Sequence, residues 1–381
     1  MIAHATMPGM DITLPTPLLA GLSPQAFMRR HWQKKPLLIR QALPGIEPPV
    51  SRAELFALAG RDDVDSRLIV QRGAAWTMRH GPFKRRQLPP LTQPGWTLLV
   101  QGVDLQVEAA HRLLSQFRFV PDARLDDLMI SHATDSGGVG PHFDSYDVFL
   151  LQVQGRRRWR IGRMADATLQ PDVPLKILAN FEAEEEMLLE PGDMLYLPPR
   201  WAHDGVAEGE CMTCSIGFRA PNDQEAVREV LQRLLETEPV DADSKQYRDP
   251  RQAATDMPAR VPDALQAFAS AAVAAVLRDP KALACTVGEW LSEPKPQVWF
   301  DERESGGTVA DVRLDRRSRM MYDNAHVFIN GESYAASGRD AALMRRLADT
   351  RALDAAGMRR LSPGARELVL GWVRSGWLHA R

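Results

Sequence analysis

The alternation of apolar and polar positions over the first two hundred residues predicts a series of short strands. Leu37 to Ile39 forms the first apolar run, and Leu68 to Val70 and Trp76 to Met78 flank Gly73 as in a hairpin. Further runs follow at similar intervals: Trp96 to Val100, Leu128 to Ser131, Val148 to Val153, Trp159 to Ile161 and Met194 to Leu197. Many short strands with few helices between them favour an antiparallel sandwich or barrel.

Helical periodicity begins only after this β region, with one exception near the start of the chain. Ser23 and Pro24 are typical of a helix start, and we expect that helix to end at Pro36. After Asn222, apolar residues recur at spacings of three and four and predict a helix of three to four turns: Val227, Val230, Leu231 and Leu234. The alanine-rich stretch from Ala264 to Leu277 predicts another helix, after a polar segment between Glu236 and Pro262.

The C-terminal part of the chain shows both the alternation typical of strands and the three-to-four-residue spacing typical of helices. Beyond the boundary at Pro294 to Pro296, a strand at Val327 to Ile329 leads into a turn at Asn330 and Gly331. Two helical stretches follow, at Leu343 to Ala348 and Ala365 to Val373. This order is typical of a small winged-helix module.

Composition excludes several classes of protein. A net charge of −2, from 47 basic and 49 acidic residues, gives the whole protein no long-range attraction to nucleic acid or anionic lipid. Three cysteines are too few for a disulfide framework and indicate a reducing, cytoplasmic setting. Met1 to Pro17 lacks the features of a signal peptide, and the longest apolar stretch, Ala267 to Leu277, is too short to cross a membrane.

One glycine-rich segment, Gly137 to Phe149, contains potential metal ligands. His142 and Asp144 stand two positions apart, and alternate side chains of an extended chain share a face, so both can bind one ion. A second segment, Glu190 to Pro199, predicts a turn, an apolar strand and a proline-fixed exit that leads to His203. Chance pairing in a core would explain a bare His-x-Asp, but the second segment favours a metal site.

Two histidines and one carboxylate form a facial set of ligands. Such a set fits Fe(II), because three octahedral positions stay open, two for a bidentate 2-oxo acid and one for O2. Zinc more commonly takes a closed tetrahedral set or a third imidazole. The sequence therefore predicts a non-haem Fe(II) oxygenase with His142, Asp144 and His203 as metal ligands and catalytic residues.

These segments resemble the cupin-type JmjC oxygenases, specifically the bacterial ribosomal oxygenases that hydroxylate an arginine of a large-subunit ribosomal protein. Arg30 to Pro36 and Gly217 to Asn222 also match, and the resemblance extends over nearly the whole chain. It implies a double-stranded β-helix catalytic domain at 1–221, a helical dimerisation region at 222–292 and a winged-helix-like domain at 293–381. It also implies 2-oxoglutarate as co-substrate, a ribosomal protein as substrate and a homodimer joined by the helices between Asp223 and Leu291.

The distal carboxylate of 2-oxoglutarate needs a fixed cation when it is buried. By similarity to the family, Arg157 binds this carboxylate and the hydroxyl of Ser131 is a second donor, with Ser215 as a weaker candidate. Alternation places Arg156 and Arg158 on the opposite face of the strand, where we interpret them as solvated side chains.

Each of three further groups of residues near these segments allows a functional and a structural interpretation. An arginine substrate requires acids at the mouth of the site, and Asp135, Tyr146 and Asp147 are candidates, although solvated surface groups would give the same pattern. The acidic run from Glu182 to Glu186 is most simply a solvated loop, and otherwise a docking surface for basic ribosomal proteins. Cys211 and Cys214 have the spacing of a redox or zinc pair, but without a second pair we interpret them as buried thiols of a strand.

Two other functions stay open. One is a ligand-sensing cupin transcription regulator, which predicts an incomplete metal triad. The other is the same chemistry on a histidine of a ribosomal protein, a tRNA base or a metabolite, because the triad specifies the oxidant and not its target. From Ser292 to Arg381, fifteen basic residues stand against twelve acidic ones, so we expect the winged helix to dock protein rather than nucleic acid.

Overall fold

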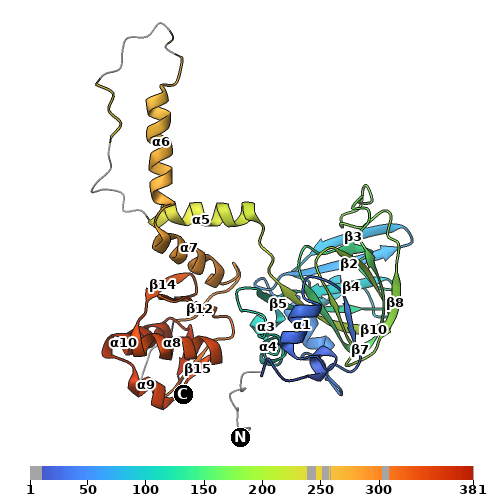
Figure 1. Ribbon diagram of the computed structural model, residues 1–381. Helices are drawn as coiled ribbons and strands as arrows, with labels where there is room; N and C mark the ends of the chain where they lie inside the picture. Colours follow the sequence, from blue (N-terminus) through green and yellow to red (C-terminus); the bar gives the residue numbers. More distant parts are fainter. Residues whose placement is uncertain (1–10, 238–245, 251–256, 258, 303–308, 381) are drawn as a thin grey trace.

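The computed structural model describes residues 11–237, 246–250, 257, 259–302 and 309–380. A β-rich N-terminal part is followed by three helices and a second folded unit at the C-terminal end (Figure 1). The polar segment expected between Glu236 and Pro262 lies largely outside the described residues.

The strands of the N-terminal part pair antiparallel in the order β1-β9-β7-β10-β5-β4-β2-β3, while β6 pairs with β10 and β8 with β7. The two longest strands, β7 and β10, are paired with each other and connect the other strands. The predicted antiparallel β architecture is therefore confirmed. The strand bounds are β1 (Leu37–Ile39), β2 (Ser66–Arg72), β3 (Ala75–His80), β4 (Trp96–Val100), β5 (Leu125–Ala133), β6 (His142–Phe143), β7 (Val148–Arg163), β8 (Glu185–Leu189), β9 (Met194–Leu197) and β10 (Trp201–Phe218).

Helix α1 (Pro24–Arg30) begins as predicted, with the Ser23 hydroxyl accepting a hydrogen bond from the Ala26 N–H. It ends at Arg30, earlier than expected, because the following turn takes Gln33 into the left-handed region at a φ of 55°. The strand pattern did not predict three further helices: α2 (Arg52–Leu58), α3 (Val103–Gln106) and α4 (Glu108–Ser115). The start of α2 carried a usable signal, since Ser51 and Glu54 form a capping box.

An aromatic core fixes the N-terminal helix against the sheet. Phe27 of α1 packs on Phe149 of β7 and Tyr196 of β9, with ring centroids 5.4 and 4.9 Å apart. All three rings are fully buried. Because β7 also buries Leu150 and Trp159 in a second cluster, it has apolar contacts on both faces and holds a fixed position.

The middle of the chain forms the two expected helices, α5 (Asp223–Thr237) and α6 (Asp263–Val276), and a third that the pattern did not predict, α7 (Pro280–Ser292). Helix α6 projects away from the rest of the molecule (Figure 1). On α5, Leu234 is buried, whereas Val227 and Leu231 are exposed. Within the described residues, no helix is long and apolar enough to cross a membrane.

The C-terminal unit has its own core, formed by residues such as Ile329, Leu347 and Val369. The strand at Val327 to Ile329 and the two helices predicted there are present, which confirms the winged-helix prediction. The elements are β11 (Val312–Leu314), β12 (Met320–Tyr322), β13 (His326–Ile329), β14 (Glu332–Ala335), α8 (Gly338–Thr350), β15 (Ala352–Leu353), α9 (Ala355–Arg360), α10 (Pro363–Arg374) and β16 (Leu378–Ala380).

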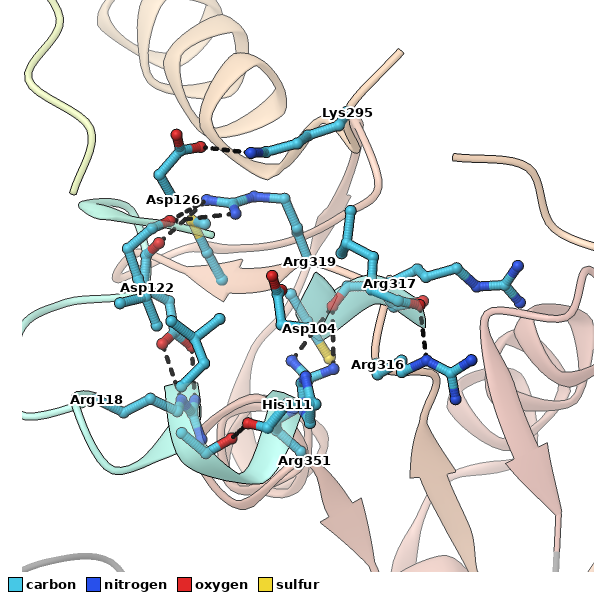
Figure 2. Close-up of a pocket in the computed structure, with 17 residues that line it drawn as sticks. Asp104, His111, Arg118, Asp122, Asp126, Lys295, Arg316, Arg317, Arg319 and Arg351 are labelled. Atoms are coloured by element: carbon cyan, nitrogen blue, oxygen red, sulfur yellow. Dashed lines mark hydrogen bonds and ion pairs between the residues drawn. The ribbon is translucent and has the colours of Figure 1, made fainter. Parts of the chain in front are cut away.

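Charged side chains join this C-terminal unit to the β-rich part (Figure 2). Lys295, which follows α7, forms ion pairs with Asp126 and Asp127 of β5 at 3.2 and 3.1 Å. Arg319, next to β12, donates hydrogen bonds to the backbone oxygens of Asp122 and Leu125 at 3.1 and 3.3 Å. Burial lowers the pKa of Arg319 to about 10, so it remains charged at neutral pH. The two units therefore have a defined relative position.

Candidate metal centre

Two paired strands bring the three predicted metal ligands together. His142 on β6 is opposite His203 on β10, and the two imidazole centroids are 4.2 Å apart. Asp144 follows β6 directly, and its Oδ2 lies 3.8 Å from the Nε2 of His203. The three candidate ligand atoms all lie within 4.8 Å of one another. A single ion can therefore contact all three side chains.

Backbone carbonyls orient both imidazoles. The Nδ1 of His142 is 2.9 Å from the Gly140 oxygen, and the Nδ1 of His203 is 3.0 Å from the Trp201 oxygen. A carbonyl oxygen can only accept, so each Nδ1 carries the hydrogen and each Nε2 presents a lone pair. Hydrogen bonds of this kind typically fix the tautomer of a metal-binding histidine.

The electrostatics of the centre favour a neutral imidazole at His203. Burial, followed by the neighbouring His142, lowers the pKa of His203 to about 4. His203 is therefore deprotonated at neutral pH, as a metal ligand must be. Two neutral imidazoles and one carboxylate fit Fe(II), and the donor set is that of the facial triad.

The glycine-rich loop before His142 lies too close to its neighbours for larger residues. A Cβ on Gly138 would stand 2.8 Å from the Gly205 oxygen of β10, and a Cβ on Gly140 would stand 2.9 Å from the Ile177 side chain. Gly140 also has a φ of +78°, which side chains rarely tolerate. These glycines let the loop approach β10 and present His142 to His203.

Arg157 lies on β7 and is buried, with 5% of its surface exposed. Its Nη1 donates to the Ser131 hydroxyl of β5 at 3.2 Å, so the two residues predicted to bind the co-substrate do meet. Its Nε and Nη2 have no hydrogen-bond partner among the residues that the structure describes. Buried unpaired donors on a cation are costly, and a bound carboxylate would satisfy both.

The sequence interpretation did not identify Trp159, which separates Arg157 from the metal ligands. The Arg157 Cζ is 5.8 Å from a Trp159 ring centroid, and the same indole is 5.9 Å from the His203 ring. Gly205 is paired with Trp159, and a Cβ there would meet the indole at 2.6 Å. Alternation along β7 was the available signal, because it puts Trp159 on the face of Arg157.

The neighbouring arginines point elsewhere, as predicted. Arg158 pairs with Glu186 at 2.7 Å and also with Glu208, while Arg156 lies 3.7 Å from Glu208. Their side chains are 42% and 54% exposed. Only Arg157 of the three is buried.

The three candidates for the mouth of the site differ in position. Asp135 is exposed, and one of its oxygens accepts the Gly209 N–H at 2.8 Å. Tyr146 is 39% exposed, and partial burial of its hydroxyl, followed by the neighbouring Asp144 carboxylate, raises its pKa. Asp147 is fully buried and accepts hydrogen bonds from the Tyr196 hydroxyl at 2.6 Å and from Gln33 at 3.1 Å. The expectation for Asp147 was therefore wrong, because its carboxylate belongs to the core.

Two further motifs can be placed. Cys211 and Cys214 are free, buried thiols of β10, which confirms their interpretation as strand residues. The acidic run from Glu182 to Glu186 is only partly a loop, because β8 begins at Glu185 and Glu186 pairs with Arg158.

Comparison with known families places this centre within a matched domain. Residues 112–226 match a model described as a JmjC domain, and residues 275–379 match one described as a ROXA-like winged helix. The first match contains all three candidate metal ligands together with Ser131 and Arg157.

Curated relatives are similar over little more than half of the chain. The Escherichia coli ribosomal protein uL16 3-hydroxylase is 43% identical over 56% of this chain and 57% of its own length. A probable ribosomal oxygenase of Haemophilus influenzae is 37% identical over 56% of this chain and 52% of its own length. These alignments thus span little more than half the length of either relative.

Solved structures are similar over a longer span. The X-ray structure of Escherichia coli YcfD has a TM-score of 0.82 and 31% identity over 94% of this chain and 98% of its own. A structure of YcfD, described as a ribosomal oxygenase in complex with cobalt and 2-oxoglutarate, has a TM-score of 0.79 at 31% identity and the same coverage.

Proposed function

This chain belongs to the JmjC ribosomal oxygenases, and on that premise we propose that it is an Fe(II)- and 2-oxoglutarate-dependent oxygenase that hydroxylates an arginine side chain of a large-subunit ribosomal protein. The observation that carries the proposal is the facial set of His142, Asp144 and His203, with the buried Arg157 on the far side of Trp159.

The roles of the chain's own residues follow from their positions. His142, Asp144 and His203 would hold Fe(II) through two Nε2 atoms and one carboxylate oxygen. The bound iron, with 2-oxoglutarate and O2, supplies the oxidising power needed to convert an unactivated C–H bond to C–OH. The backbone hydrogen bonds on both Nδ1 atoms keep the imidazoles in place before the metal arrives.

Arg157 and Ser131 would bind the distal carboxylate of 2-oxoglutarate. The guanidinium offers the unpaired Nε and Nη2 as a planar fork, which matches the geometry of a carboxylate. Trp159 contacts both Arg157 and His203, so its indole would form part of the wall of the co-substrate site. Burial of Arg157 excludes water and strengthens its attraction for the anion.

The target is proposed from the family and from the acids near the loop. The relative named as a ribosomal protein uL16 3-hydroxylase makes uL16 the first substrate to test. Asp135 is the acid proposed to bind the substrate guanidinium, because it is exposed and enters the glycine-rich loop before His142. Accurate placement of the target carbon is required, since small displacements cost large factors in rate.

We also propose a division of labour along the chain: catalysis by residues 1–221, homodimerisation by 222–292 and protein docking by the winged-helix-like domain at 293–381. The exposed Val227 and Leu231 on α5 support the dimer, because an apolar stripe that none of the described residues covers favours association. A ribosomal protein substrate supports activity in the cytoplasm.

The test is mass spectrometry of ribosomal proteins from cells with and without the enzyme. We expect the mass of one added oxygen atom on one arginine of a large-subunit protein only when the enzyme is present. Purified enzyme should release succinate with that protein only when Fe(II), O2 and 2-oxoglutarate are all supplied. Modification of a histidine, or of no ribosomal protein, would contradict the arginine assignment.

A further inference from the structure

An apolar groove of about 640 Å³ lies at the junction between the β-rich part and the winged helix. Helix α7 lines it through Leu283, Val287 and Leu291, and the winged helix lines it through Met321 and Phe328. The chain after α4 contributes Pro121 to the lining. The groove adjoins the charged junction of Figure 2 but is lined mainly by apolar side chains.

Close packing between α7 and the winged helix fixes the walls of the groove. Gly288 brings α7 against the winged helix, because any Cβ there would stand 2.3 Å from the Phe328 ring. Phe328 itself is buried at 3% exposure, whereas Leu283 and Tyr322 at the rim are 38% and 40% exposed. An open apolar surface of this size on a rigid junction is typical of a site for a partner.

The polar groups of the groove are mostly acidic. Asp122, Asp323 and Asp349 line it, and Arg118 is the one arginine or lysine among the described residues of the lining. Arg118 pairs with Asp122 at 2.6 Å. The other two carboxylates are held by hydrogen bonds, Asp323 from the His326 N–H and Asp349 from the Tyr322 hydroxyl. The groove therefore combines apolar walls with a negatively charged rim and matches a partner that carries apolar side chains next to lysine or arginine.

A second copy of this chain fits that description poorly. The exposed apolar side chains of its helical region lie on α5, α6 and α7. Helix α5 contains four acidic and two basic residues, α6 contains Asp263 as its one charged residue, and α7 contains Lys281 and Glu289. None of these helices carries a net positive charge to the rim. A ribosomal protein does, because proteins that bind RNA carry an excess of lysine and arginine.

We infer that this groove is a docking site for a basic segment of the ribosomal protein substrate, distinct from the segment that enters the metal centre. The inference rests on the proposed function and deepens it. Apolar side chains of the segment fill the space between α7 and the winged helix, and its cations face Asp323 and Asp349. The enzyme thereby selects the folded or full-length substrate by contacts outside the catalytic domain.

The experiment compares the intact ribosomal protein with a short peptide around its hydroxylated arginine, using the full-length enzyme. The groove variants are Leu283→Lys and Asp349→Lys, and the matched controls are Leu14→Lys and Glu47→Lys, also on exposed positions. We expect each groove variant to raise KM for the intact protein about tenfold and to leave kcat unchanged. KM for the short peptide should stay at the wild-type value, as should both constants in the controls.

Each alternative outcome is recognisable. Wild-type KM for the intact protein in both groove variants would overturn the docking site, and so would an equal rise of KM for both substrates, which would indicate damage to the catalytic domain. Loss of a dimer in light scattering by Leu283→Lys would assign the groove to a second copy. Asp349 is exposed, so Asp349→Lys keeps the test valid if Leu283→Lys unfolds. A wild-type enzyme that modifies no ribosomal protein would refute the proposed function itself.

Discussion

Replacing Arg157 by methionine tests the co-substrate site most directly. Methionine keeps an unbranched apolar stem and removes every guanidinium donor. Two of those donors, Nε and Nη2, have no hydrogen-bond partner among the described residues. Their removal therefore breaks no hydrogen bond in the ligand-free protein. Arg157→Met should therefore impair binding of 2-oxoglutarate without destabilising the ligand-free protein.

The expected loss of affinity follows from the burial of the guanidinium. A hydrogen bond between charged groups contributes about 1.5–3 kcal/mol, and removal of one partner of a buried ion pair costs about 3–5 kcal/mol. Taking about 3 kcal/mol, and about 1.4 kcal/mol for each tenfold change, KM for 2-oxoglutarate rises roughly 10²-fold. Arg157→Lys retains the charge but not the planar fork, so its KM should be intermediate.

The stability of the ligand-free protein should respond differently. A change at a buried position usually costs about 0.5–3 kcal/mol of the free energy of unfolding. Here the lost packing is offset by the removal of a buried cation whose one hydrogen bond to a described side chain is to Ser131. We expect the free energy of unfolding to stay within about 1 kcal/mol of wild type.

The assays are succinate release against 2-oxoglutarate concentration, calorimetric titration of 2-oxoglutarate into Mn(II)-loaded protein, and denaturant unfolding without ligand. Arg156→Met is the matched control, because Arg156 is adjacent, exposed and paired with Glu208. Its KM should equal that of wild type. A KM for Arg157→Met within threefold of wild type would refute the assignment, whereas a large loss of unfolding free energy would show that Arg157 is mainly structural.

Three other predictions follow from the structure. Asp144→Ala should abolish succinate release, and wild-type release in that variant would disprove the triad. Val227→Glu with Leu231→Glu should convert a dimer to a monomer in light scattering, since both side chains are exposed on α5; a monomeric wild-type protein would contradict dimerisation. Asp135→Ala should lower arginine hydroxylation something like 10²-fold while uncoupled 2-oxoglutarate consumption continues, so equal losses of both would argue against a role in substrate binding.

Local pattern was sufficient wherever the determining interaction is local. The strand at Leu37 to Ile39 and the Ser23 cap appear where predicted because alternation and capping depend on residues a few positions apart. The same holds for the metal ligands, since a His-x-Asp in an extended segment must present both side chains on one face. The capping box of Ser51 and Glu54 is equally local, but it lies between predicted strands, and the strand pattern does not predict a helix there.

The burial of charged side chains and their hydrogen-bond partners, by contrast, depend on segments that are far apart in the chain. Asp135 and Asp147 flank the same motif, yet Tyr196 and Gln33 bury Asp147 in the core while Asp135 stays exposed. The groove on α7 likewise exists only because Gly288 meets Phe328 of the winged helix. The sequence alone determined the strands, the winged helix and the type of metal site, because their patterns repeat over a few residues. Only the tertiary structure decided which charges are buried and which surfaces stay open, because both depend on what the rest of the chain places beside them.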